Sequence, residues 1–228
     1  MISQKIDEIR NRIASAAISA GRDAQEIKLV AVAKGQPIEK MRQAIEAGQR
    51  DFGENYAQEL LAHSEQTGPA PIWHFIGHLQ KNKVKQILPL VTLIHSVDSI
   101  ELARTIDRRA AAIGKTQSIL IEINLGGEKT KSGMSLSDVE KQTVEMNALD
   151  HVDLQGFMTL PPYDSDPERS RPYFRRLREI RDEMNKKIVY KHALTELSMG
   201  MSHDFEIAIE EGATIVRIGT AIFGERQK

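Results

Sequence analysis

One short stretch decides the fold: residues 28–34, with the sequence KLVAVAK. Positions 29–33 form an unbroken apolar run, which predicts a strand buried on both faces, as in parallel sheets covered by helices. The run stops at Lys34, and a helical pattern begins after Pro37. A lysine at the carboxyl end of a buried parallel strand lies at the end of an α/β barrel where the active site is usually found. Position alone also permits a second interpretation, in which Lys34 merely ends the strand in solvent.

The same rhythm of a short apolar strand followed by a helix continues to the end of the chain. Seven further strands are expected, at 51–53, 72–77, 91–95, 118–124, 154–158, 196–198 and 214–218. Eight such units in a chain of 228 residues fit a closed (β/α)8 barrel better than an open doubly wound sheet. Residues 1–228 are then expected to form one domain, with an extra amphipathic helix before the first strand.

The composition excludes several classes of protein. The net charge is −1, so no basic field attracts nucleic acid or an anionic membrane. No stretch approaches the ~20 apolar residues of a membrane span, and the pattern from Ile2 to Ala20 predicts an amphipathic helix, not a signal peptide. The absence of cysteine excludes disulfides and thiolate metal sites, and it fits a cytosolic protein.

Two glycine-bearing loops follow the last two expected strands. Ser198, Met199 and Gly200 open the first loop, and Gly219 and Thr220 open the second. In α/β barrels a phosphate commonly binds between these two loops, because small residues let backbone N–H groups approach an anion and hydroxyls add further donors. The alternative is that the glycines only shape turns.

Arg217 lies inside the last expected strand, where its side chain faces away from those of its neighbours. A buried arginine must find a partner, either a carboxylate in the core or a ligand. A nucleophilic amine at Lys34, a phosphate cup and this arginine together suit a phosphorylated aldehyde held as a Schiff base. Pyridoxal 5′-phosphate (PLP) is the commonest such ligand.

Seven motifs carry a resemblance to a known family. They are VAK (32–34), FGENY (52–56), HFIGHLQKNK (74–83), HSVD (95–98), GFMT (156–159), LSMGMS (197–202) and VRIGTAIFG (216–224). With these motifs the chain resembles the PLP homeostasis proteins, which are single-domain barrels related to the N-terminal domain of alanine racemase. The resemblance runs nearly from end to end.

The resemblance implies a role for each candidate residue. Lys34 would carry the Schiff base, Arg217 would face the pyridine nitrogen, and Asn55 would lie beside the cofactor. The phosphate would be held by the loops that contain Ser198, Met199, Gly200, Gly219 and Thr220. One departure concerns the lysine motif: the family usually has Ser-Lys-Thr-Lys-Pro, whereas Ala33, Gly35 and Gln36 surround the lysine here. The affinity for PLP and its exchange rate depend on that difference.

Arg217 also bears on the mechanism. An arginine has no acceptor and leaves the pyridine nitrogen unprotonated, so the ring stabilises carbanions weakly. The resemblance therefore implies a monomeric carrier that gives PLP to apo-enzymes, without robust catalysis of its own. Two alternatives stay open: an amino-acid racemase-like enzyme, which needs a second proton-transfer group, and a Schiff-base aldolase.

A metal site is not expected. His74 and His78 are four residues apart, but they flank Gly77 at the end of a strand, where they do not share a helical face. Trp73 and Phe75 are expected in the core. The charged run 169–187 predicts a helix with a solvated face.

Overall fold

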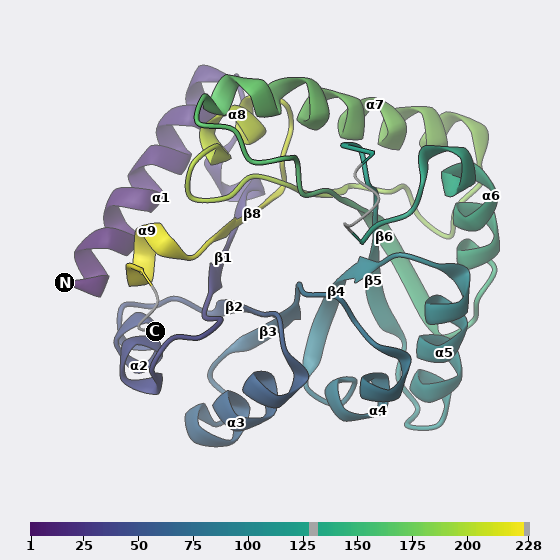
Figure 1. Cartoon of the computed structure of the whole chain (residues 1–228), viewed down its shortest axis with the longest axis horizontal. Helices are drawn as coiled ribbons and strands as arrows, with labels where there is room; N and C mark the ends of the chain where they lie inside the picture. The colour runs from purple at the N-terminus through teal and green to yellow at the C-terminus, as the bar shows by residue number, and fades with distance from the viewer. Residues whose placement is uncertain (128–131, 226–228) are drawn as a thin grey trace.

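The computed structural model describes residues 1–127 and 132–225, and within them eight parallel strands form a closed barrel (Figure 1). The strands are β1 (Lys28–Val32), β2 (Asp51–Glu54), β3 (Ile72–Phe75), β4 (Val91–Val97), β5 (Gln117–Glu122), β6 (Val152–Met158), β7 (Glu196–Ser198) and β8 (Ile215–Ile218). They are hydrogen-bonded in chain order, and β8 pairs with β1 to close the barrel. The expected (β/α)8 barrel is confirmed.

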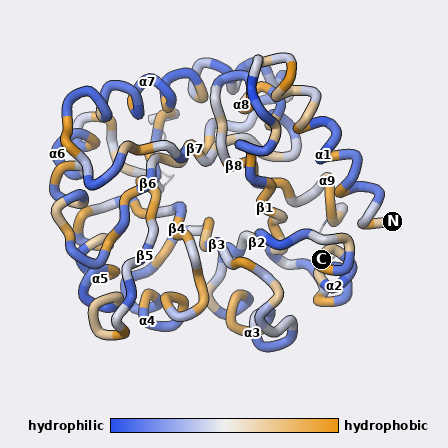
Figure 2. Tube along the Cα trace, turned by 180° about the vertical axis from the view of Figure 1, so that it is seen from behind, coloured by the Kyte–Doolittle hydropathy of each residue, from blue (hydrophilic) through white to orange (hydrophobic). Residues whose placement is uncertain are grey.

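Helices surround the barrel (Figure 1). They are α1 (Ile2–Ser19), α2 (Ile38–Glu46), α3 (Ala57–Thr67), α4 (Val84–Ile87), α5 (Ile100–Ala111), α6 (Leu136–Asn147), α7 (Arg171–Lys187), α8 (Phe205–Glu210) and α9 (Thr220–Phe223). Short 3-10 turns are η1 (Ala24–Glu26), η2 (Lys81–Lys83) and η3 (Pro167–Ser170). The helices bury apolar residues at helical spacing, as Leu102, Ile106 and Ala110 do in α5. Figure 2 shows hydrophilic residues along much of α7.

A small apolar cluster is separate from the main core between barrel and helices. Its members, contributed by β1, β4, β5, β6 and β8, are Val30, Leu93, Leu120, Met158 and Ile215. Side chains alternate across a strand, so Arg217, two residues after Ile215, faces the same side nearer the carboxyl end of β8. The strand pattern in the sequence predicted this orientation.

The extra helix before the first strand is present as α1. It packs against α2, α8 and α9, so the first and last helices of the chain lie side by side (Figure 1). Its buried residues recur every three or four positions: Ile2, Ile6, Ile9, Ile13, Ala16 and Ala17. This apolar stripe explains why a helix outside the barrel repeat is held on its surface.

Two expected elements differ from the structure. The first strand ends at Val32, so Lys34 lies in the turn after it. The helix expected around 79–88 is reduced to η2 and the four residues of α4, because Leu79 and Gln80 form an extended segment before it. Trp73 and Phe75 are buried, as expected. Among the described residues, no helix has the length and apolar content needed to cross a membrane.

Candidate functional site

Lys34 lies just past the carboxyl end of β1. The residue is partly buried, and its Nζ atom lies 4.9 Å from the centroid of the Tyr56 ring. No described carboxylate forms an ion pair with this amine. An amine without a fixed counter-ion is available to react with an aldehyde. The structure therefore brings Lys34 to the end of the barrel where the sequence predicts the chemistry.

The loop after β8 begins beside the end of β1. Ala31 is the register partner of Ile218, and a Cβ atom on Gly219 would lie 3.3 Å from Cβ of Val32. Lys34 follows Val32 by two residues. The second glycine-bearing loop and the lysine therefore adjoin at the same end of the barrel.

The loop after β7 is pressed against α8. Gly200 has a φ of +90°, and a Cβ atom at this position would lie 2.6 Å from Cβ of Ala208 and 2.9 Å from Cα of Phe205. Only glycine fits both the backbone conformation and the space. The Met199 side chain is fully buried in the core. Gly200 and Met199 therefore offer their backbone, not side chains, to a ligand.

Ser202 joins the two loops, and the sequence analysis did not select it. The backbone N–H of Ala221, in the first turn of α9, donates to Oγ of Ser202 at 3.3 Å. The N–H groups of Gly219, which precedes α9, and of Thr220, its first residue, have no acceptor within the helix by helix geometry. The signal in the sequence was the second serine of LSMGMS, two residues after the motif's glycine.

Arg217 is buried, with 3% of its surface exposed. Its Nη1 donates to Oγ of Ser198 at 2.5 Å, and its Nη2 donates to the carbonyl oxygen of Thr159 at 3.0 Å. Burial lowers the pKa of Arg217 to about 10, against the negative charges of Glu122 and Asp204. Its partners in the described structure are thus neutral, and two of the five guanidinium donors are used.

These features agree with what comparison with known proteins shows. The family model described as "Alanine racemase, N-terminal domain" matches residues 5–227. The pyridoxal phosphate homeostasis protein of Aquifex aeolicus is 47% identical over 228 residues, covering 98% of both chains. The chain belongs to the pyridoxal phosphate homeostasis protein family. The Escherichia coli K12 member is 37% identical over 229 residues, covering 99% of this chain and 97% of its own.

Solved structures support the same family and fold. PipY of Synechococcus elongatus, with PLP bound, has a TM-score of 0.85 and 31% identity, covering 98% of this chain and 100% of its own. An alanine racemase of Clostridium difficile has a TM-score of 0.73 at 17% identity. The alignment covers 96% of this chain but 56% of the racemase, so this likeness concerns the barrel alone. The resemblance seen in the sequence is confirmed for family and fold.

Ser198, which the family resemblance assigned to the phosphate, points into the barrel. The residue is fully buried, and its Oγ lies between Nη1 of Arg217 and Nδ1 of His95, 2.8 Å away. The hydroxyl is therefore already engaged by two protein groups. A phosphate contact from this side chain stays a prediction, whereas Ser202 and Thr220 lie in the loops themselves.

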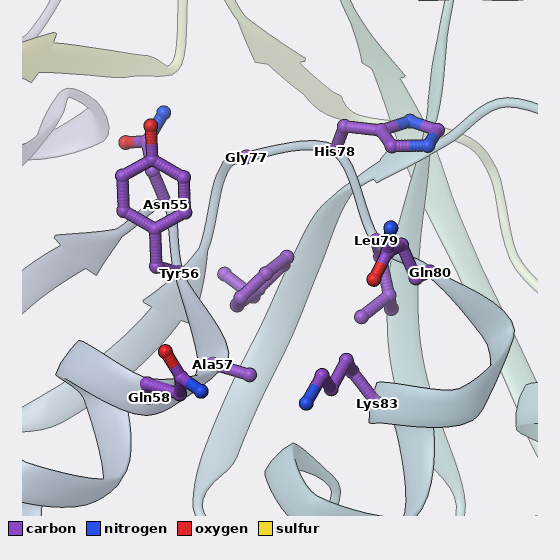
Figure 3. Close-up of a pocket in the computed structure, with 10 residues that line it drawn as sticks. Asn55, Tyr56, Ala57, Gln58, Gly77, His78, Leu79, Gln80 and Lys83 are labelled. Atoms are coloured by element: carbon purple, nitrogen blue, oxygen red, sulfur yellow. The ribbon is translucent and has the colours of Figure 1, made fainter.

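Asn55 follows β2 and lines a pocket of about 450 Å³ next to Tyr56 (Figure 3). The loops after β2 and β3 form its two sides, and Lys83 extends into the hollow from η2 (Figure 3). A Cβ atom on Gly77 would lie 2.3 Å from the carbonyl oxygen of Asn55. Glycine at position 77 thus allows the two loops to approach, and the pocket opens beside the ring that Nζ of Lys34 faces.

Glu122 adds a second buried charged group near this end of the barrel. It is the last residue of β5 and is 3% exposed. Ser132 donates to its Oε1 at 2.9 Å, while its Oε2 has no partner in the described structure. Burial raises the pKa of Glu122, against the hydrogen bond from Ser132. The carboxyl group therefore has a free oxygen and a bias toward its neutral form.

His74 and His78 contact different partners. His74 is buried between Asp51 and His95, whereas the His78 side chain is 60% exposed, with Nδ1 3.4 Å from Asp98. The four-residue spacing does not bring the two rings to one point. Among the described residues, no group of three or more histidine, aspartate or glutamate side chains is arranged to hold a metal ion.

Proposed function

We propose that this protein holds PLP as a Schiff base on Lys34 and serves PLP homeostasis as a carrier. One observation carries the proposal: Lys34 and the loop that begins at Gly219 adjoin at one end of the barrel, and the amine has no described carboxylate partner. A family member that covers the same length has been solved with PLP bound. PLP supplies an aldehyde for the lysine and a phosphate for the loops.

The residues present fit such a ligand. Gly200 and Gly219 keep side chains out of the space between the loops, and a Cβ at either position would press on neighbouring atoms. Thr220 and Ser202, which lie in the two loops, supply hydroxyl groups for the phosphate. Ser198 can add a further donor only when its hydroxyl proton turns away from His95. We assign Arg217 to the pyridine nitrogen, because its guanidinium is buried without a carboxylate and retains unused donors. Asn55 would lie beside the ring.

We further propose that the protein lacks robust catalysis of its own. Arg217 donates hydrogen bonds and cannot accept a proton, so a pyridine nitrogen beside it stays unprotonated. This arrangement withdraws electrons weakly, which favours holding the cofactor over turning over substrates. The expected monomeric state and cytosolic location stay predictions.

The absorption spectrum of the purified protein, incubated with PLP and desalted, tests the proposal. We expect a visible band of a protonated Schiff base in the wild type and none in Lys34→Ala. Lys81→Ala is the matched control, because Lys81 is an exposed lysine in η2 with no described role in the site. Borohydride reduction and peptide mass spectrometry should place the pyridoxyl group on Lys34.

Failure to load the wild type, or an adduct on another lysine, contradicts the proposal. Two further measurements separate carrier from enzyme. The carrier should restore the activity of a PLP-dependent apo-enzyme at a rate faster than dilution of free PLP explains. A racemase-like enzyme should instead exchange the Cα proton of free amino acids with deuterated solvent, and the carrier should show essentially no exchange.

A further inference from the structure

A chain of hydrogen bonds runs through the barrel interior, from its amino-terminal end to the cofactor end. It starts at Asp51, the first residue of β2, whose Oδ1 lies 3.0 Å from Nε2 of His74. Nδ1 of His74 lies 2.9 Å from Nε2 of His95, and Nδ1 of His95 lies 2.8 Å from Oγ of Ser198. Arg217 donates to the same Oγ. Three adjacent strands, β2 to β4, thus connect to the residue that ends β7.

Only one of the four linked side chains has appreciable contact with solvent. His74 is 1% exposed, and His95 and Ser198 are fully buried, whereas the Asp51 side chain is 21% exposed. Buried polar groups are retained when each has a partner, and here every ring nitrogen has one. The chain therefore connects the solvent side of Asp51 to the buried guanidinium of Arg217.

An ionised Asp51 fixes the direction of every hydrogen bond in the chain. A carboxylate only accepts, so His74 must donate through Nε2–H, and its neutral ring then accepts at Nδ1. His95 must therefore donate through Nε2–H and accept at Nδ1. Ser198 in turn donates its hydroxyl proton to His95, while its Oγ accepts from Arg217.

We propose that Asp51, His74, His95 and Ser198 form a proton relay that serves the cofactor site. A proton that reaches Oγ of Ser198 releases the serine's own proton to Nδ1 of His95. The Nε2 proton of His95 then passes to Nδ1 of His74. One proton has been taken up, and it remains on His74 as an imidazolium ion paired with Asp51; the reverse sequence returns it.

His95 transmits the proton and does not store it. Burial holds the pKa of His95 well below its ordinary value, and the charge of a protonated His74 and the charges of Arg217 and Lys28 act in the same direction. These charges come from β3, β8 and β1, and the carboxylate that answers them in the chain is Asp51 of β2, which contacts His74. The stored proton is therefore stabilised at His74 and not at His95.

The relay deepens the proposed function, on which it rests. Its last member, Ser198, contacts Arg217, which we assign to the pyridine nitrogen of PLP. After proton uptake His95 donates to Ser198, so the serine's hydroxyl proton no longer points at the imidazole. Ser198 can then donate toward the mouth of the barrel. Proton uptake at the far end would thus change what the cofactor site offers a ligand.

Histidine ¹⁵N NMR of the full-length, ligand-free protein tests the relay, because long-range ¹H–¹⁵N spectra identify each tautomer. At pH 8 we expect His74 and His95 to be neutral, both with the proton on Nε2. On acidification His74 should become doubly protonated, and His95 should change to the Nδ1–H tautomer with the same midpoint. A histidine pair with a merely structural role would show no such coupled change.

Two variants locate the effect. Asn at position 51 still accepts from His74 but removes the charge that stabilises the imidazolium ion, so Asp51→Asn should weaken the coupled change of His74 and His95. The matched control is Asp153→Asn, which changes a comparable carboxylate 3.0 Å from the half-exposed His192 and should leave the midpoint unchanged. Ser198→Ala cuts the link between the two imidazoles and the cofactor site. The two rings should still change together, because a protonated His74 requires Nε2 of His95 as its acceptor, but PLP loading should no longer shift their midpoint.

The relay is overturned if His95 carries its proton on Nδ1 at pH 8, if its tautomer stays fixed while His74 titrates, or if His74 stays neutral throughout the folded pH range. The wild-type titration decides these outcomes even if a variant fails to fold. Adding PLP separates the two proposals: loading should shift the shared midpoint. A protein that cannot be loaded refutes the carrier function, whereas a loaded protein without the coupled change refutes the relay alone.

Discussion

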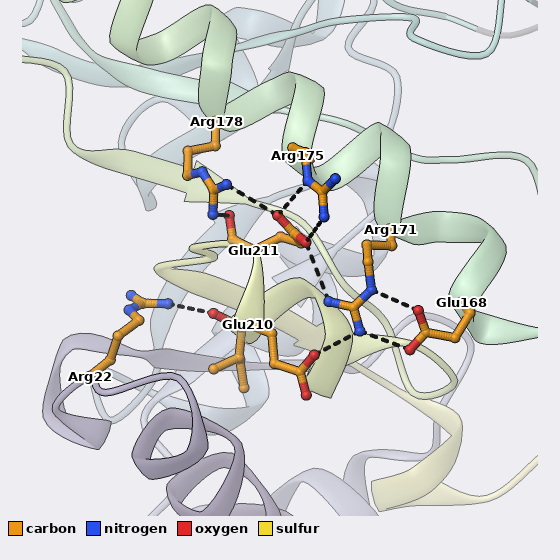
Figure 4. Close-up of polar contacts among 8 residues, drawn as sticks. Arg22, Glu168, Arg171, Arg175, Arg178, Glu210 and Glu211 are labelled. Carbon is orange, nitrogen blue, oxygen red and sulfur yellow. Dashed lines mark hydrogen bonds and ion pairs between the residues drawn. The ribbon is translucent and has the colours of Figure 1, made fainter.

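Two arginine sites show how differently this fold treats the same side chain. On the surface, Arg171, Arg175 and Arg178 of α7 converge on Glu211, just after α8 (Figure 4). The Glu211 side chain is 6% exposed, and it forms ion pairs of 3.0–3.3 Å with all three. Inside the barrel, Arg217 is more deeply buried than any of these arginines, yet its described partners are a hydroxyl and a carbonyl.

This difference indicates that the Glu211 cluster stabilises the fold, whereas Arg217 is available to bind a ligand. The surface cluster is complete: a carboxylate meets its cations, and Arg171 also pairs with Glu168 and Glu210 (Figure 4). A buried arginine without an ion pair is a poor stabilising element, because the charges of Glu122 and Asp204 only partly offset its desolvation. We therefore expect changes in the cluster to alter the free energy of unfolding, and changes at Arg217 to alter PLP retention.

The largest expected effect is on stability, in Glu211→Ala. Removing the shared carboxylate leaves three arginines without their common partner, so the free energy of unfolding should fall by about 2–3 kcal/mol. Urea unfolding at pH 7 measures this change. The control is Glu179→Ala, because Glu179 is 48% exposed in its pair with Arg176 and should contribute less than about 0.5 kcal/mol. The retention of PLP should not change in either variant.

The contribution of Glu211 should also disappear in acid. Burial acts to raise the pKa of Glu211, but hydrogen bonds from Arg175 and Arg171 outweigh burial and hold the pKa below its ordinary value. A depressed folded pKa means that the stabilisation is complete above the unfolded value of about 4.3 and is lost as pH falls through the folded value. The gap between wild type and Glu211→Ala should therefore narrow below about pH 4; a gap independent of pH contradicts this account.

Arg217→Met should produce the opposite pattern. The substitution removes a buried charge together with two hydrogen bonds, so the stability of the ligand-free protein should change by less than about 1 kcal/mol. Loss of a charged donor to the ring nitrogen, about 2 kcal/mol, should accelerate PLP release about thirtyfold. Transfer of PLP to an excess of apo-enzyme measures the release rate. Arg178→Met is the matched control, with reduced stability and unchanged release, and equal effects in both variants would end the distinction.

The sequence permitted the prediction of features that depend on neighbouring residues. The apolar run at 29–33 predicted β1 and placed Lys34 at its end, and alternation around Val216 predicted that Arg217 faces away from its neighbours. Ser198 was predicted at the end of β7, but its engagement with His95 was not, since the two are 103 residues apart. Only closure of the barrel brings them together. In the sequence His74 was considered only with His78, four residues away, whereas its partners in the structure are Asp51 and His95.

Loop geometry set a second limit to prediction from the sequence. The glycines after β7 and β8 allowed both loops to be predicted, because glycine at the end of a barrel strand is typical of a phosphate loop. The hydrogen bond from Ala221 to Ser202 depends on how the two loops turn toward each other, and no spacing rule gives that. The helix expected at 79–88 was too long because the apolar pattern does not distinguish a helix from an extended segment at its start. Leu79 is buried in an extended segment, and Val84 is buried in the short helix α4 that follows.

Gly219→Ala should have a smaller effect on PLP binding than Arg217→Met, again with little change in stability. A Cβ at this position would lie 3.3 Å from Val32, at an ordinary φ, so the fold should tolerate it with a small backbone shift. The methyl group would occupy space at the phosphate loop, and PLP affinity should fall several-fold, or about 1 kcal/mol, in an absorbance titration. Gly200→Ala is the contrasting variant, because contacts of 2.6 Å and 2.9 Å at a φ of +90° should destabilise the protein itself. If Gly219→Ala instead unfolds the protein and leaves affinity unchanged, Gly219 belongs to the fold and not to the ligand site.

The smallest expected effect reverses the pH dependence of Glu211. Burial raises the pKa of Glu122 inside the barrel, so the folded state takes up a proton at a higher pH than the unfolded state does. The contribution of this group to wild-type stability therefore increases as pH falls through its raised pKa, whereas glutamine at this position does not titrate. We expect Glu122→Gln to be more stable than the wild type at pH 8, and the difference should be smaller at pH 5. Urea unfolding at both pH values measures it. A difference that grows on acidification would mean that Arg217 holds Glu122 ionised, and the buried arginine would then have the carboxylate partner that the surface cluster has.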